Sequence, residues 1–150
     1  MKTYNLQDCL LFEGIDEHYV DSFLSDCTEI SLKKNAFLFE KDDVGDEMYI
    51  LLNGCVEILF NKKETPGPDI KLHITKPGSV IGELCVFGQR TRSASIRAIE
   101  NSQLLKISGE EFRIRIYAKE LDAMLICYNI AKVLSERLTE TDLLLLKHCS

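Results

Sequence analysis

The sequence has no stretch that approaches the roughly eighteen apolar residues of a membrane-spanning helix, and residues 1–8 contain no apolar run long enough for a signal peptide. It also has no excess of positive charge, because 18 Lys and Arg residues against 24 Asp and Glu residues leave a net charge of -6. Nucleic acids and acidic membranes both bind concentrated positive charge, which argues against either as the main partner. These absences predict a cytoplasmic protein.

Clustered metal ligands are also missing. His18, His73 and His148 are dispersed along the chain, and no Cys-x-x-Cys pair occurs. The six cysteines are widely spaced: Cys9, Cys27, Cys55, Cys85, Cys127 and Cys149. We therefore expect no metal site and no cofactor. We interpret the cysteines as reduced thiols, with a disulfide between two that meet in space as the alternative.

Signs of a catalytic centre are equally few. Ser93 and Ser95 are candidate nucleophiles, but neither has a base nearby in sequence or the strand-turn-helix setting of a Gly-x-Ser-x-Gly motif. A metal-dependent jelly-roll enzyme would need ligands in a cluster, which the dispersed histidines do not supply. The sequence therefore favours a binding protein over an enzyme.

The middle of the chain has the pattern of a β-rich domain. Its 150 residues, 45% of them hydrophobic, suit a single domain, 1–150, with a sizeable core. Asn53-Gly54 predicts a tight hairpin, and residues 61–69 predict an exposed hairpin loop. The spacing of the strands predicts an α+β fold built on an antiparallel β jelly-roll barrel. Short apolar or alternating runs place strands at 30–32, 36–39, 48–51, 56–60, 71–74, 95–98 and 103–107.

After Ser108 the pattern becomes helical. Ser108 can cap a helix with Glu110 and Glu111 in its first turn, and helix is expected to the end of the chain. Apolar residues then recur every three or four positions and predict one amphipathic face: Leu121, Met124, Leu125, Tyr128, Ala131, Val133, Leu134 and Leu138. That face is expected to pack against the barrel, and part of it to pair with a second copy or to cover the nucleotide; the two expectations are compatible. The apolar run 143–146 is expected to dock on the domain or on a partner.

The segment 82–95 has the most chemical content and reads Gly-Glu-Leu-Cys-Val-Phe-Gly-Gln-Arg-Thr-Arg-Ser-Ala-Ser. Gly82 lets the backbone bend and approach a ligand, and a helical turn over 83–86 would point its first N–H groups at an anion. Arg92 offers a planar fork of donors for two phosphate oxygens, while Glu83 can accept a hydrogen bond from a ribose hydroxyl. The alternative is an ordinary surface ion pair between Glu83 and Arg92.

This segment resembles the phosphate-binding cassette of cyclic-nucleotide-binding domains, in which Gly-Glu-Leu is followed by an Arg, a small residue and Ala. Residues 10–24 resemble the opening Leu-Phe segment and short helix of that family. Residues 41–58 resemble its Gly-Asp, Tyr-x-Ile and Gly-x-Val pattern. Thr91 departs from the Pro that many members have before the Arg, although some members have Thr there. The resemblance covers most of the chain.

The resemblance implies an N-terminal helical part over about 1–28, a β-barrel over 29–107 with a short cassette helix, and C-terminal helices over 108–150. It implies cyclic AMP or cyclic GMP as the ligand. The residues that would bind it are Gly82, Glu83, Leu84, Cys85, Arg92, Ser93 and Ala94.

The choice of base depends on Ser93. A hydroxyl after the Arg contacts the guanine amino group in relatives selective for cyclic GMP, but Ser also occurs there in a bacterial relative that binds cyclic AMP. We expect cyclic AMP more than cyclic GMP. Arg90 and Arg97 add positive charge near the cassette and are interpreted as solvated surface groups.

The function expected from these features is a sensor that transmits ligand occupancy through its C-terminal helix, which would cover the base. The alternative is a domain of the same fold that binds no ligand and acts as a dimerisation or docking module. A third hypothesis is a regulatory piece that controls an effector protein on a separate chain. Bacterial transcription factors of the family have a helix-turn-helix after the long helix, and none follows here, so DNA binding is not expected.

Overall fold

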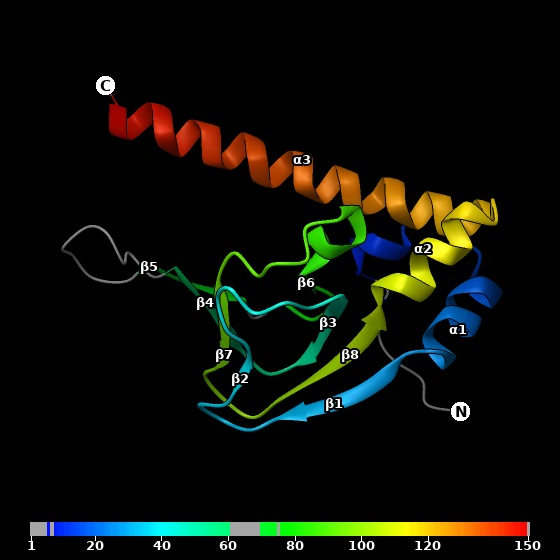
Figure 1. Cartoon of the computed structure of the whole chain (residues 1–150), viewed down its shortest axis with the longest axis horizontal. Helices are drawn as coiled ribbons and strands as arrows, with labels where there is room; N and C mark the ends of the chain where they lie inside the picture. Colours follow the sequence, from blue (N-terminus) through cyan, green and yellow to red (C-terminus); the bar gives the residue numbers. More distant parts are fainter. Residues whose placement is uncertain (1–5, 7, 61–69, 75, 150) are drawn as a thin grey trace.

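The fold consists of two antiparallel sheets with helices gathered at one end (Figure 1). A computed structural model describes residues 6, 8–60, 70–74 and 76–149. The strands are β1 (Thr28–Leu32), β2 (Phe37–Phe39), β3 (Glu47–Asn53), β4 (Val56–Phe60), β5 (Ile70–Ile74), β6 (Val80–Ile81), β7 (Ser95–Ala98) and β8 (Ser102–Ser108). The helices are the 3-10 turns η1 (Leu10–Phe12) and η2 (Glu83–Phe87) and the α-helices α1 (Glu17–Ser25), α2 (Gly109–Tyr117) and α3 (Leu121–Cys149).

The strands pair in two four-stranded sheets, in the orders β1-β8-β3-β6 and β2-β7-β4-β5. Every pairing is antiparallel, as the sequence predicts, and the arrangement is jelly-roll-like without closing into one barrel. The alternation along β3 explains its continuous apolar run. Tyr49 and Leu51 face the space between the sheets, whereas Met48 and Ile50 face the helices. β3 is therefore buried on both faces.

Two features of the strands differ from the sequence prediction. The two-residue strand β6 was not predicted, because so short a run shows no periodicity. The prediction of a tight hairpin at Asn53-Gly54 is wrong. Strands β3 and β4 lie in different sheets, and the chain crosses from one sheet to the other here. Gly54 has a φ of +98°, and a Cβ on it would come within 2.7 Å of the Ser102 backbone. Residues 61–69, the predicted exposed loop, lie outside the described residues.

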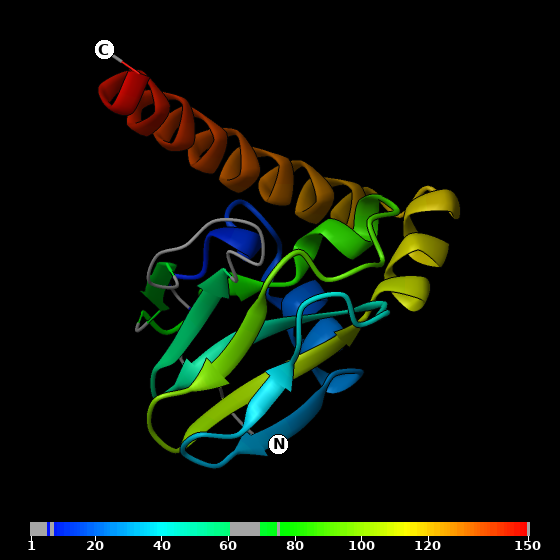
Figure 2. The same cartoon turned by 60° about the vertical axis from the view of Figure 1, so that its left-hand side comes forward.

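The helix predicted after Ser108 begins there, because the Ser108 hydroxyl accepts a hydrogen bond from Glu111 N. It does not continue unbroken. Lys119, between α2 and α3, has a φ of +63°, which no residue adopts inside a right-handed helix. The chain therefore changes direction before α3, the 29-residue helix whose C-terminal half extends away from α1 and α2 (Figure 2).

The face of α3 that packs on the domain is not the predicted one. Ala123, Ile126, Asn129 and Ile130 are buried against η1 and the helical core. Of the predicted face, Leu125, Val133 and Leu134 are half-buried, and the exposed members are Leu121, Met124, Tyr128, Ala131 and Leu138.

Of the two alternatives for residues 143–146, docking on the domain is wrong, and docking on a partner stays a prediction. The four leucines of this run are 55–67% exposed. Every residue from 135 to 149 is exposed, so the second half of α3 makes little contact with the rest of the chain.

Candidate functional site

The cassette follows β6 and forms the helical turn that the sequence predicts. Gly82 stands at the N-cap of η2 with a φ of +74°, a region that glycine enters without steric cost. A Cβ on Gly82 would lie 2.7 Å from Arg92 Nη1. The first N–H groups of η2 have no partner within the helix, as at any helix start. Gly82 is therefore required by both its conformation and the space that Arg92 occupies.

Arg92 is buried and incompletely hydrogen-bonded. Its side chain is 6% exposed, Nη2 donates to the carbonyl of Glu47 at 2.8 Å, and Nη1 donates to the carbonyl of Gly82 at 3.4 Å. Its Cζ lies 4.2 Å from the centre of the Phe39 ring. Its Nε is buried and has no hydrogen-bond partner. A buried charged donor without a partner is costly, so this guanidinium is suited to receive an anion.

Glu83 is equally buried but does not pair with Arg92. Its side chain is 6% exposed and accepts a hydrogen bond from Arg137 Nη1 of α3. Arg137 Nη2 donates to the carbonyl of Val80 at 3.1 Å. The alternative of a surface ion pair between Glu83 and Arg92 is therefore wrong, because both side chains are buried and each has a different partner. Arg137 joins α3 to the predicted ribose-binding carboxylate.

A second arginine holds the cassette from the side of α2. Arg113 Nη1 donates to Asp46 Oδ1 at 2.8 Å and to the carbonyl of Cys85 at 3.0 Å. The hydrogen bonds from Arg113 lower the pKa of Asp46, and the charges of Arg90 and Arg92 add to this effect. The carboxylate is therefore held in its ionised form. Through Arg113, the position of η2 depends on α2.

The other predicted ligand-binding residues lie along the same segment with different exposures. Leu84 is 40% exposed, and Ser93 is also exposed. Cys85 and Ala94 are buried, and burial raises the pKa of the Cys85 thiol. The side chains of Leu84 and Ser93 are therefore open to solvent, whereas Cys85 and Ala94 could contact a ligand only through their main chain or after a local shift.

The two flanking arginines differ from each other. Arg90 is exposed, as predicted. Arg97 is not a solvated surface charge, because its Nε donates to Glu57 Oε1 at 2.7 Å and the Glu57 side chain is only 6% exposed. Arg97 therefore neutralises a buried carboxylate of β4 and has a structural role.

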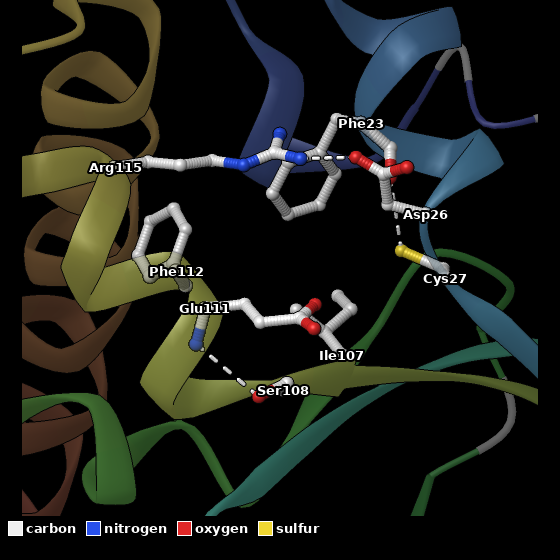
Figure 3. Close-up of a pocket in the computed structure, with 8 residues that line it drawn as sticks. All are labelled: Phe23, Asp26, Cys27, Ile107, Ser108, Glu111, Phe112 and Arg115. Carbon is white, nitrogen blue, oxygen red and sulfur yellow. Dashed lines mark hydrogen bonds and ion pairs between the residues drawn. The ribbon is translucent and has the colours of Figure 1, made fainter.

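A separate small cavity lies between α1, β8 and α2 (Figure 3). Its volume is about 20 Å³, room for a single water molecule. Arg115 pairs there with Asp26, and burial raises the pKa of the Cys27 thiol to about 12. The lining residues are Phe23, Asp26, Cys27, Ile107, Ser108, Glu111, Phe112 and Arg115. The cavity is too small for a nucleotide.

Other kinds of site are not formed by the part of the chain that the structure describes. It holds no group of three or more His, Cys, Asp or Glu side chains placed to bind a metal ion. None of its helices is long and apolar enough to cross a membrane. All six cysteines lie within it and are unpaired, which agrees with their interpretation as thiols.

Comparison with known proteins identifies the class of protein that has these two sheets and this cassette. The family model of the cyclic nucleotide-binding domain matches residues 29–116, and the chain belongs to that family. The family consists of regulatory ligand-binding domains. The chain is therefore a binding domain and not an enzyme, as the sequence predicts.

Among curated proteins, the cyclic AMP receptor protein of Thermus thermophilus is 29% identical over 133 residues, which are 89% of this chain and 59% of the relative. The human cyclic nucleotide-gated channel beta-1 is 34% identical over 102 residues, 64% of this chain and 8% of the channel. The chain thus spans less than two thirds of the length of each of these relatives.

Among solved structures, the catabolite activator protein of Thermus thermophilus superposes with a TM-score of 0.78 at 28% identity, over 91% of this chain and 61% of that one. The N-terminal domain of a transcriptional regulator from Streptomyces coelicolor gives a TM-score of 0.75 at 22% identity, over 91% of this chain and 94% of that one. The second likeness is one of fold alone.

Proposed function

We propose that the chain is a cyclic-nucleotide sensor in which Arg92 binds the phosphate and Glu83 the ribose. The observation that carries the proposal is the unpartnered Nε of the buried Arg92 guanidinium. An anion that reaches Arg92 would satisfy this donor, and a planar guanidinium can hold two phosphate oxygens at once. Glu83 keeps an acceptor oxygen beyond the one that Arg137 uses. Leu84, Cys85, Ser93 and Ala94 form the rest of the proposed site with Gly82.

The same proposal assigns the output to α3. Arg137 contacts Glu83, so a hydroxyl that binds Glu83 alters the environment of a residue on α3. A ligand shifts a conformational equilibrium only by its difference in affinity for the two states. We expect slower hydrogen exchange over 121–149 when cyclic AMP is bound. Equal exchange with and without cyclic AMP would contradict transmission through α3.

Cyclic AMP is the ligand that we favour over cyclic GMP. Ser93 is exposed, and its hydroxyl does not distinguish the two bases, so this choice rests on the likeness to the Thermus thermophilus protein that is named a cyclic AMP receptor. The net charge of -6 argues against nucleic acid and acidic membranes as partners. We also propose that residues 1–150 form a single domain and that the protein works in the cytoplasm.

The exposed apolar residues of α3 favour a second candidate, association. Tyr128 and Leu138 are both 62% exposed on the helix that carries Arg137. A second copy of this chain, paired along α3, would cover them, and a separate effector protein is the alternative occupant. If association is the only function of the chain, Arg92 does not need to bind a nucleotide.

Thermal unfolding with cyclic AMP and, separately, cyclic GMP tests the function. At a hundred times the dissociation constant, binding stabilises the fold by about 2.7 kcal/mol, which raises the unfolding midpoint by roughly 5–10 °C. The shift should vanish in Arg92→Ala. The absence of a shift with either nucleotide would favour the docking module.

A further inference from the structure

Asp46, Glu47 and Glu83 are acidic residues in or beside the cassette, and two of them have close arginine partners. Asp46 Oδ2 is 2.5 Å from Arg113 Nη2, and Glu83 is hydrogen-bonded to Arg137. Each of these pairs is locally neutral. The third acidic side chain, Glu47, has its Oε2 3.7 Å from Nη2 of the proposed phosphate-binding arginine, which is beyond hydrogen-bonding distance.

The main chain and a side-chain hydrogen bond hold the Glu47 carboxylate in this place. The Glu47 carbonyl accepts a hydrogen bond from Arg92 Nη2 at 2.8 Å, so the backbone lies directly against the guanidinium. Glu47 Oε2 accepts a hydrogen bond from Asp46 N at 3.2 Å, which orients the side chain. The Glu47 side chain is 41% exposed, whereas Arg92 is 6% exposed. A negative charge therefore stands at the solvent side of a buried positive one.

The charge of a ligand determines its Coulomb energy with Arg92 and Glu47. A phosphate bound at Arg92 is attracted by the guanidinium and repelled by the Glu47 carboxylate, and both energies scale with the phosphate charge. A cyclic phosphodiester has one negative charge. A phosphomonoester has about 1.5 to 2 negative charges at pH 7. The repulsion from Glu47 is therefore nearly twice as large for the non-cyclic nucleotide.

We propose that Glu47 is a specificity-determining residue that weakens the binding of phosphomonoesters at Arg92 more than that of cyclic nucleotides, and so shifts selectivity away from the hydrolysis products. The proposal rests on the proposed function, in which Arg92 holds the phosphate. It assigns to Glu47 a role in selection and none in holding the ligand. Removal of its charge should tighten the binding of every phosphate-bearing ligand, and most of all that of the ligand with the highest charge.

Calorimetric titration of cyclic AMP and 5′-AMP into the wild type and Glu47→Gln tests this directly. Gln keeps the length of the side chain and an oxygen that can accept from Asp46 N. We expect Glu47→Gln to bind cyclic AMP about threefold more tightly and 5′-AMP about tenfold more tightly, because a doubled charge squares the factor. Glu47→Ala also removes the charge and should change the ratio of the two affinities in the same direction. Asp21→Asn, an exposed neutralisation on α1, should leave the ratio unchanged.

The outcomes separate the two claims. An equal increase in affinity for both nucleotides in Glu47→Gln, or no increase, would overturn the role of Glu47. Binding of cyclic AMP in the same experiment would still support the proposed function. A failure of cyclic AMP to bind the wild type and both Glu47 variants would overturn both claims. Higher ionic strength should reduce the gain, since the carboxylate is partly exposed and its field is screened. A gain that is independent of salt would point to a change of shape and would contradict the charge mechanism.

Discussion

Gly45 and Gly82 determine how closely the backbone approaches the Arg92 guanidinium. A Cβ on Gly45 would lie 2.6 Å from Arg92 Nη2, and one on Gly82 would lie 2.7 Å from Nη1. Gly82 also has a positive φ, whereas Gly45 does not. At Gly45, therefore, a side chain is excluded only by the space that Arg92 occupies. A substitution there tests the close approach of the backbone to the guanidinium without adding backbone strain.

Gly45→Ala should weaken the binding of cyclic AMP by about tenfold, equivalent to 1.4 kcal/mol, because the added methyl group must displace the guanidinium. Titration of both proteins measures the change. Gly14→Ala is the control, since Gly14 has a φ of +75° but no atom within 4 Å of its added Cβ, so it introduces strain without a clash. Unchanged affinity in Gly45→Ala would show that the position of Arg92 does not control binding.

At the scale of the residue, the sequence predicts those parts of the candidate site that lie within one continuous segment. Gly82, Glu83 and Arg92 fall within it and were predicted from the physical chemistry of a turn and an anion. Arg137 and Arg113 were not, because their partners Glu83 and Asp46 lie 54 and 67 positions away in the sequence. An arginine on a helix gives no signal of a partner so distant, and only the fold brings the pair together.

At the scale of the element, the ion pair between Arg113 and Asp46 ties the cassette to α2. The pKa of Asp46 is lowered from 3.8, chiefly by the hydrogen bonds from Arg113. A lowered pKa in the folded state stabilises the fold above pH 3.8, and this stability is lost as the pH falls through the lowered value.

Arg113→Gln should therefore lower the free energy of unfolding at pH 7 by about 1–2 kcal/mol, and the difference from the wild type should shrink below about pH 4. It should also weaken the binding of cyclic AMP, because the Cys85 carbonyl in η2 loses its donor. Urea unfolding from pH 7 to pH 3 measures the first effect. A difference in stability that stayed constant over this range would contradict the assigned pair.

The contact of α3 with η1 includes one buried amide among apolar side chains. Asn129 is 4% exposed, and its Nδ2 donates to the carbonyls of Leu11 at 3.0 Å and Glu13 at 2.9 Å. The sequence did not predict this face, since the apolar pattern around α3 marks more than one side and the buried side includes a polar residue. The amide is tolerated because both of its N–H groups are hydrogen-bonded.

Asn129→Ala should destabilise the fold by about 2–3 kcal/mol, since both carbonyls lose their donor, and lower the unfolding midpoint by roughly 5–10 °C. Asn53→Ala is the matched control. Asn53 is exposed and donates to Gln103 Oε1 at 2.8 Å, so its loss should cost no more than about 0.5 kcal/mol. Equal effects of the two variants would contradict the structural role of Asn129.

At the scale of the whole molecule, the positions of the strands other than β6 were predictable from the sequence, and their pairing into two sheets was not. Alternation of apolar residues locates individual strands, but which strands pair depends on contacts between distant segments. The step from β3 to β4 shows this, because Asn53-Gly54 has the composition of a hairpin turn while the chain there crosses to the other sheet. The space beside Ser102 admits only glycine at that crossing.

The exposed side of α3 predicts an assembly of two chains. Sedimentation equilibrium should give twice the 17.1 kDa mass of one chain for the wild type. Tyr128→Glu should reduce the mass to that of one chain, because a charge would be buried between the helices. Tyr117→Glu, on α2 and 83% exposed, should leave the mass unchanged. A monomeric wild type would leave the α3 surface to another partner.

The central claim, that Arg92 binds the phosphate of a cyclic nucleotide, is tested most directly by calorimetric titration of cyclic AMP into the wild type and Arg92→Lys. Lys keeps the positive charge but lacks the planar fork of donors and the Nε donor. We predict one nucleotide bound per wild-type chain and an affinity at least about tenfold lower for Arg92→Lys. No binding to the wild type, or equal binding to both proteins, would contradict the account.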